Sequence, residues 1–127
     1  MIQTKFTGNK KVSVEINGFT VNTDLPAVYK GDNTAPNPFD LCLASFAACT
    51  AVFAMLYTEK VGISKEGIDV ALDPVFNKEG LMESAKVIVS VPAAFPKEHE
   101  AGILNMVEHC KVGRHLNVPH TVVLVRK

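Results

Sequence analysis

The sequence predicts an α+β fold, and three features of its 127 residues support this prediction. Residues 12–23 contain two runs in which apolar and polar side chains alternate, which is typical of β-strands. Residues 41–58 carry no charged side chain and have the length of a long helix, and residues 66–91 contain two further strand-like runs. Because one domain usually takes roughly 100 to 200 residues, we expect a single domain over residues 1–127.

The first two predicted strands flank the dipeptide Asn17-Gly18. This dipeptide favours the type I′ turn that joins the strands of a tight β-hairpin. Residues 29–36 then gather Gly, Asp, Asn, Thr and Pro ahead of the uncharged run. These are turn-forming residues, so we expect an exposed loop there.

A long helix is predicted after this loop. Asn37 is suited to cap its start, Pro38 to fill its first position and Asp40 to face the unpaired N–H groups of its first turn. Gly62 is suited to end it. Residues 41–58 are apolar almost all round and lack the basic and aromatic flanks of a membrane anchor, so we expect a central buried helix and no membrane span.

The second half of the chain predicts two more strands, at residues 66–72 and 84–91, separated by the turn formers Asp73-Pro74 and residues 77–80. Pro96 opens a second, shorter helix that we expect to end near Cys110, and residues 120–126 form a last strand. Since hairpins favour antiparallel pairing, the predicted sheet is antiparallel. One small chain offers little surface to cover such a sheet and an apolar helix, and this predicts a homodimer.

Composition excludes several classes of protein. Lys and Arg total 13, as do Asp and Glu, so no net charge attracts nucleic acid or anionic lipid. The odd number of cysteines, three, argues against a secreted disulfide scaffold. Residues 1–6 lack the apolar core of a signal peptide, and we therefore expect a cytoplasmic protein.

The cysteines are the first candidates for chemistry. Cys42 and Cys49 lie on one face of the long helix together with Ser45, whereas Cys110 follows the shorter helix. Taken alone, each cysteine is better explained as a small buried apolar residue. Cys42 lies about 10.5 Å before Cys49 along the helix axis, too far for a disulfide, so we expect it in the core.

Two separated motifs make the cysteines more informative. Together they resemble the OsmC/Ohr family of osmotically inducible and organic hydroperoxide resistance proteins, over residues from about Asn33 to Val125. The motifs are Asn37-Pro38 followed by Leu41 and Leu43-Ala44-Ser45-Phe46-Ala47-Ala48-Cys49-Thr50, and Cys110-Lys111-Val112-Gly113-Arg114-His115-Leu116.

This resemblance implies an OsmC-like fold, in which two α+β chains form an intertwined homodimer and the two cysteines meet beside the interface. It also implies a thiol peroxidase. Cys49 would react with an organic hydroperoxide to form a sulfenic acid, Cys110 would convert this acid to a disulfide, and a dithiol reductant would reset the pair. An apolar substrate pocket would then be lined by Phe39, Phe46 and Phe53, for which core packing is the alternative explanation.

The sequence also departs from the family pattern. Hydroperoxide reductases of this family activate the cysteine with an Arg from the N-terminal region and a Glu near the helix start. This chain has only Arg114 and Arg126, and it has Phe39 where that Glu would be. Asp40 follows, but it lies about 13 Å from Cys49 along a straight helix and on the opposite face.

Another cation must therefore stabilise a Cys49 thiolate. Arg114, four residues after Cys110, is the best candidate, although a surface salt bridge is an equally good explanation for it. The next candidates are Lys10, Lys11 and Lys30. The missing activating pair leaves a second function open, a slow or non-catalytic OsmC-like protein that binds a small molecule or senses redox state.

Other cofactor chemistry is not indicated. His109, His115 and His120 fit no standard zinc spacing with Cys110. The chain has no Gly-rich phosphate loop and no motif of a serine hydrolase or zinc protease. We therefore expect neither a metal nor a cofactor.

Overall fold

The computed structural model of the chain describes residues 1–117 and 119–127. It consists of two compact units, residues 1–43 and residues 44–127. Each unit contains one three-stranded sheet, and the chain has the mixed α+β composition that the sequence predicts. The expectation of a single domain stays a prediction.

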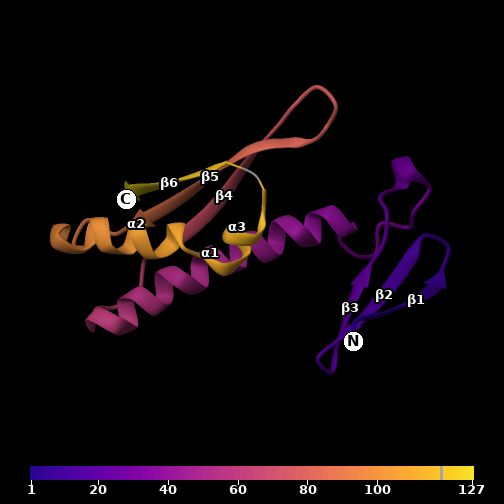
Figure 1. The fold of residues 1–127 in the computed structure, drawn as a ribbon, viewed down its shortest axis with the longest axis horizontal. Helices are drawn as coiled ribbons and strands as arrows, with labels where there is room; N and C mark the ends of the chain where they lie inside the picture. Colours follow the sequence, from indigo (N-terminus) through magenta and orange to yellow (C-terminus); the bar gives the residue numbers. More distant parts are fainter. Residues whose placement is uncertain (118) are drawn as a thin grey trace. The chain divides into compact units, whose positions relative to one another are not determined.

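The sheet of the first unit is an antiparallel meander of β1 (Gln3–Gly8), β2 (Lys11–Ile16) and β3 (Phe19–Thr23), drawn in indigo and violet in Figure 1. Asn17 and Gly18 both have positive φ angles, 50° and 82°, as a type I′ turn requires. The predicted hairpin is thus confirmed. β1 was not predicted, because all its residues are exposed and its sequence has no apolar alternation.

The loop after β3 is organised around Asp24, which is fully buried. Its carboxylate accepts hydrogen bonds from the Leu25 N–H (2.7 Å), the Thr34 N–H (3.0 Å) and the Thr34 hydroxyl (2.7 Å). A short 3₁₀ helix, η1 (Ala27–Tyr29), lies between the bonded residues. A side chain at Gly31 would overlap the Leu25 carbonyl, so this turn accepts only glycine there.

Helix α1 (Pro38–Val61) begins and ends where the sequence predicts. The Asp40 N–H donates to Asn37 Oδ1, and the Asn37 amide donates to the Asp40 carboxylate, each over 2.9 Å. At the other end, Gly62 takes the left-handed conformation, with φ 72°. The predicted cap and stop signals are both confirmed.

The predicted long helix is confirmed, and within the single chain it is buried along one face. Its buried residues form one stripe with a spacing of four residues, namely Phe46, Thr50, Ala54 and Thr58. The helix is long and apolar enough to cross a membrane, with a mean hydropathy of 1.9 and only 17% of the apolar window buried. A single helix of this kind is weak evidence for a membrane span, because core helices share these properties.

The sheet of the second unit has the order β4 (Asp69–Phe76), β5 (Met82–Val91), β6 (His120–Arg126). β4 and β5 pair antiparallel, but β5 and β6 pair parallel, which corrects the expectation of a purely antiparallel sheet. The connection from β5 to β6 contains helices and returns the chain to the end where β5 begins. Pro74 lies within β4 and not in a turn, since β4 is an edge strand and tolerates a missing N–H.

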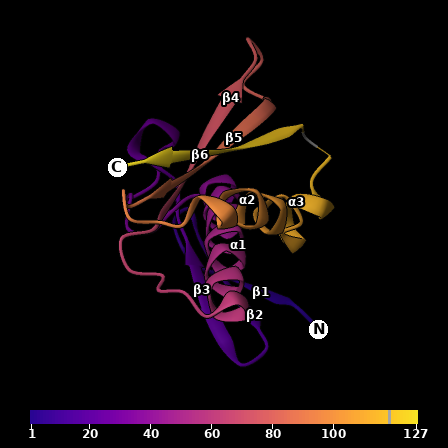
Figure 2. The same cartoon turned by 90° about the vertical axis from the view of Figure 1, so that its left-hand side faces the viewer.

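Helices cover one face of this sheet, as Figures 1 and 2 show. The second helix is α2 (Glu100–Glu108), which follows the 3₁₀ helix η2 (Lys97–His99) and ends beside Cys110 as predicted. The side chains on the covered face of β5 alternate with exposed or half-buried ones, and they form the core with α1 and α2. The buried core residues of these elements are Ala85, Val87, Val89, Val91, Phe46, Ala54, Ile103 and Val107.

One short helix was not predicted. α3 (Lys111–His115) has only five residues, too few for a helical period to show in the sequence. It lies between α2 and β6 and therefore comes directly after Cys110. Its first turn forms part of the candidate site.

Candidate functional site

The structure brings together the two cysteines that the resemblance singles out. Cys49 lies in the middle of α1 and Cys110 lies at the start of α3, and both belong to residues 44–127. Although 61 residues separate them in the sequence, they are close enough for Cys49 to raise the pKa of Cys110. Cys110 is fully buried and Cys49 is half-buried, whereas Cys42 is a half-buried residue of the first unit.

The first turn of α3 donates backbone N–H groups to both sulfurs. The Val112 N–H donates to Cys49 Sγ over 3.4 Å, and the Gly113 N–H donates to Cys110 Sγ over 3.2 Å. Cys110 therefore caps α3 with sulfur, in the way that Ser or Asp usually caps a helix with oxygen. This cap fixes the Cys110 side chain. The Val112 N–H, two residues after Cys110, points to the sulfur of Cys49.

Burial raises the pKa of the Cys110 thiol above its usual value of 9.0. The Gly113 N–H opposes this effect, the charge and the hydrogen bond of Cys49 add to it, and the positive charge of Arg114 opposes it. Because the upward effects prevail, Cys110 is held as a protonated thiol.

The predicted activating residues have other surroundings. Arg114 is exposed in α3, and its charge acts on Cys110. Asp40 takes part in the cap of α1 with Asn37. A role of either residue in activating Cys49 stays a prediction. The alternative cations Lys10, Lys11 and Lys30 all belong to the first unit.

Gly113 lies close to Cys110, Phe46 and His120. A Cβ atom at this position would lie 2.9 Å from Cys110 Sγ, 3.2 Å from Phe46 Cε1 and 3.3 Å from His120 Cε1. The rings of Phe46 and His120 meet edge to face, with centroids 5.4 Å apart and an interplanar angle of 88°. The side of the site that faces the core is thus closed by one aromatic ring and one imidazole.

The sequence does not predict that Gly113 and His120 lie at this site. It indicates His120 only as a candidate metal ligand and Gly113 only as part of a motif. The glycine three residues after Cys110 was the available signal, because a close approach of side chains to a helix requires a residue without Cβ. No local pattern connects His120, the first residue of β6, with a cysteine ten residues earlier.

The three aromatic residues predicted to line a substrate pocket lie in different surroundings. Phe46 is 1% exposed and belongs to the core, and Phe53 is half-buried and packs against that core. Phe39 is exposed at the start of α1, in the first unit. A cavity of about 130 Å³ in the second unit is lined by none of them, but by Ala51, Ala54, Met55, Lys65, Ile68 and Val70.

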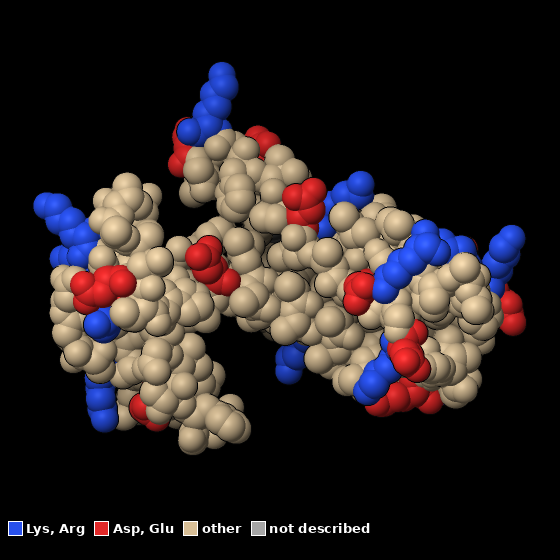
Figure 3. Space-filling model, turned by 180° about the vertical axis from the view of Figure 1, so that it is seen from behind, with Lys and Arg blue, Asp and Glu red and all other residues tan. Residues whose placement is uncertain are grey.

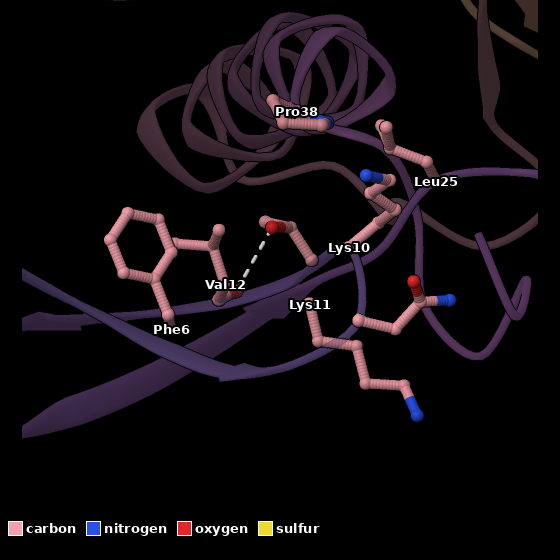
Figure 4. A pocket seen from close by; sticks show the side chains of 8 residues that line it. Phe6, Lys10, Lys11, Val12, Leu25 and Pro38 are labelled. Atoms are coloured by element: carbon pink, nitrogen blue, oxygen red, sulfur yellow. Dashed lines mark hydrogen bonds between the residues drawn. The ribbon is translucent and has the colours of Figure 1, made fainter. Parts of the chain in front are cut away.

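A second cavity, of about 270 Å³, lies entirely within the first unit and is shown in Figure 4. Its walls are mainly apolar, with Phe6, Val12, Leu25 and Pro38 among them. The Lys10 amino group points toward Leu25 and Pro38, whereas Lys11 extends away from them and pairs with Asp32 over 3.1 Å. The cavity is smaller than most sites that enclose a drug-sized ligand.

Charged side chains of both signs are interspersed on the face seen in Figure 3, where no large patch of one sign occurs. Among residues 1–117 and 119–127, no three His, Cys, Asp or Glu side chains are grouped to hold a metal ion. The His109 and His115 rings each contact a carbonyl of the preceding helical turn, Asn105 and Lys111 respectively. The cysteine pair with its N–H donors is therefore the chemically distinctive site of the second unit.

Comparison with known proteins gives the same assignment as the motifs. The family model described as OsmC-like protein matches residues 31–124, which confirms the resemblance. No curated protein matches the sequence.

Solved structures show the fold. A Psychrobacter arcticus protein named for osmotic stress and detoxification responses has a TM-score of 0.80 at 15% identity, covering 99% of this chain and 94% of its own. An organic hydroperoxide resistance protein of Elizabethkingia anophelis has a TM-score of 0.67 at 15% identity, covering 100% and 96%. The organic hydroperoxide resistance protein OsmC of Legionella pneumophila has a TM-score of 0.65 at 17% identity, covering 98% and 95%.

Proposed function

Because the chain belongs to the OsmC-like family, we propose that it is a two-cysteine thiol peroxidase that reduces organic hydroperoxides. The observation that carries this proposal is that one turn of α3 donates N–H groups to both sulfurs, from Val112 to Cys49 over 3.4 Å and from Gly113 to Cys110 over 3.2 Å. Two thiols held at the same turn are suited to the one covalent bond that the cycle must form between them. The names of the Elizabethkingia and Legionella proteins support hydroperoxides as the substrate class.

In the first step, the Cys49 thiolate attacks the terminal oxygen of the hydroperoxide R–O–O–H. The O–O bond breaks, its electron pair leaves with the RO group, and a proton completes the alcohol ROH. Cys49 is thereby oxidised to a sulfenic acid. The half-buried position of Cys49 gives a peroxide access to its sulfur, and the Val112 N–H fixes the direction in which that sulfur points.

In the second step, the Cys110 sulfur attacks the Cys49 sulfur. The S–S bond forms as the S–O bond breaks, and the hydroxyl leaves as water after it takes up the proton that Cys110 loses. Burial keeps Cys110 away from peroxide and protonated until then, which suits a resolving cysteine. An external dithiol reduces the disulfide and restores both thiols.

The proposal extends to the assembly and its location. A second copy of the chain covers the exposed apolar side of α1, and a reducing cytoplasm keeps the three free cysteines reduced. Phe39 and Phe53 are candidates for contact with the apolar part of a substrate, because both are partly exposed.

A second function has one observation in its favour. The positive charge of Arg114, the predicted activating residue, acts on the buried Cys110 thiol. The chain also lacks the Arg and Glu that activate the cysteine in hydroperoxide reductases of the OsmC/Ohr family. An OsmC-like protein that reacts slowly and binds a small molecule or senses redox state would have these features.

The deciding experiment is single-turnover consumption of cumene hydroperoxide and of hydrogen peroxide by the reduced protein. We expect rapid consumption that is lost in Cys49→Ser, and a sulfenic acid that accumulates in Cys110→Ser. Cys42→Ser is the matched control and should behave as the unmodified protein. Slow consumption that does not depend on Cys49 would contradict the peroxidase and favour the binding or sensing function.

A further inference from the structure

The resolving step needs a group that accepts a proton. Cys110 is fully buried, burial raises its pKa, and it must lose its proton before or while it attacks the Cys49 sulfur. The donors around the two sulfurs, the N–H groups of Val112 and Gly113, are amides and accept no proton. A nearby base would carry the proton from Cys110 to the leaving hydroxyl.

His120 is the base that the fold brings to this place. The point where a Gly113 Cβ would lie is 2.9 Å from Cys110 Sγ and 3.3 Å from His120 Cε1. These two distances place Cε1, which is bonded to both ring nitrogens, within about 6 Å of the sulfur. A proton acceptor acts directly or through one water molecule, and this range allows either.

The surroundings hold this imidazole in position and leave its nitrogens available. Its ring is fixed edge to face against the buried Phe46, and its backbone pairs with Ala85 of β5. No ring nitrogen of His120 makes a hydrogen bond with the residues that the structure describes, 1–117 and 119–127. By contrast, His109 and His115 are engaged with backbone carbonyls.

We propose that His120 accepts the proton of the Cys110 thiol when Cys110 attacks the oxidised Cys49 sulfur. This inference rests on the proposed function, because it concerns the second step of the peroxidase reaction. The S–H bond of Cys110 breaks as the S–S bond forms, the imidazole takes the proton, and the leaving hydroxyl of the Cys49 sulfenic acid receives it as water departs. No oxidant beyond the hydroperoxide is needed.

The pH dependence of this step is the diagnostic property. Only a neutral imidazole accepts a proton, so with His120 as the base the rate of disulfide formation should rise with pH and level off once the ring is neutral. Without that base the rate should follow ionisation of the Cys110 thiol, whose raised pKa keeps it rising up to pH 9. Other titratable groups on the elements around His120 include Cys49 of α1, Lys111, Arg114 and His115 of α3, and Glu83 and Lys86 of β5.

The test separates the resolving step from peroxide chemistry. One equivalent of 5,5′-dithiobis(2-nitrobenzoate) is mixed with reduced protein in a Cys42→Ser background. Cys49 releases one thionitrobenzoate and becomes a mixed disulfide, and attack by Cys110 then releases a second in a phase independent of protein concentration. The rate of this second phase is measured from pH 5 to 9.

His120→Phe keeps a ring against Phe46 and removes the base. We expect its second phase to slow about 100-fold near pH 7, the lower end of the contribution of a positioned acid–base group, and to keep rising up to pH 9 where the parent rate levels off. His120→Gln should give the same profile if the phenylalanine variant does not fold. His115→Gln, the matched control, should keep the rate and the profile of the parent.

A second phase with parent rate and pH profile in both His120 variants would overturn the inference. Failure of the proposed function is a separate result, since it would appear as Cys49 that hydroperoxides do not oxidise while the second phase still depends on His120. With hydroperoxide as oxidant, the same variants should form the Cys49 sulfenic acid at the parent rate and retain it longer.

Discussion

Gly113 lies beside both the Cys110 sulfur and the His120 ring. Its position in α3 needs no left-handed conformation, so alanine is acceptable to the backbone there. The added Cβ would nevertheless lie 2.9 Å from Cys110 Sγ, closer than such contacts normally are. One of the atoms around it must therefore move.

The Gly113→Ala variant should form the Cys49–Cys110 disulfide about 10-fold more slowly and lose about 1–3 kcal/mol of unfolding free energy, because overpacking displaces the sulfur. The second thionitrobenzoate phase and urea unfolding measure the two effects. Gly102→Ala is the control, since its Cβ would instead press on the Tyr57 hydroxyl. That variant should lose stability and keep the disulfide rate, and a similar loss of rate in both variants would contradict the local explanation.

The ionised Asp24 carboxylate stabilises the loop that follows β3 in the first unit. The Thr34 N–H holds the pKa of its carboxyl at about 2, below the usual 3.8, with further help from the Thr34 hydroxyl and the Leu25 N–H against the opposing effect of burial. A lowered pKa in the folded state means that the ionised form stabilises the fold. The contribution is complete above the ordinary pKa and is lost as the pH falls toward 2.

The folded protein should therefore lose stability between about pH 4 and pH 2, and Asp24→Asn should lack most of this dependence while being less stable at pH 7. Urea unfolding across this pH range measures both effects, with hydrogen exchange at Thr34 as a local probe. Asp32→Asn is a control, because Asp32 is exposed and pairs with Lys11. An unchanged acid dependence in Asp24→Asn would contradict this account.

At the scale of elements, Arg126 connects the end of β6 to the segment between β5 and α2. Its Nη1 donates to the carbonyls of Pro92 (3.1 Å), Ala93 (2.8 Å) and Phe95 (2.7 Å), and its Nη2 pairs with the Glu100 carboxylate in the first turn of α2. This explains why the second of the two arginines in the chain is structural.

Arg126→Lys should cost about 1–3 kcal/mol of unfolding free energy, because one ammonium cannot replace a guanidinium that satisfies three carbonyls and a carboxylate. Thermal and urea unfolding measure the loss. Glu100→Gln removes the ion pair alone and should cost no more than about 1 kcal/mol. Equal losses in the two variants would show that the carbonyl bonds contribute little.

The assembly of the protein depends on the exposed apolar face of α1. Its residues in the second unit that face away from the buried stripe are small or apolar and exposed: Ala44, Ala48, Ala51, Val52 and Leu56. A contiguous apolar surface of this kind usually marks a protein–protein or membrane contact. The small alanines allow a second helix to approach closely, which favours a second copy of the chain.

We therefore expect a homodimer by light scattering at micromolar concentration, and a shift toward monomer in Ala48→Glu, where a charge would be buried at the interface. Glu59→Gln, near the charged end of the same helix, should leave the dimer intact. A parent protein that is monomeric at this concentration would contradict the prediction, and a protein that requires detergent would indicate a membrane contact.

Local signals in the sequence determined much of the fold. Asn17-Gly18 specified its turn, Asn37 and Gly62 specified the ends of α1, and the alternation from residue 84 to 91 specified β5, because each depends on backbone conformations of neighbouring residues. The two cysteine motifs also indicated the family. Such features need no knowledge of distant contacts.

Tertiary structure alone decided the rest. The parallel pairing of β6, the insertion of Pro74 into β4 and the exposed strand β1 depend on which strands become neighbours, and short-range patterns do not encode this. The same holds for the site. Cys49, Cys110 and His120 come from α1, the α2–α3 junction and β6, and only the packing of these elements on one face of the sheet brings a thiol pair and an imidazole to the same glycine.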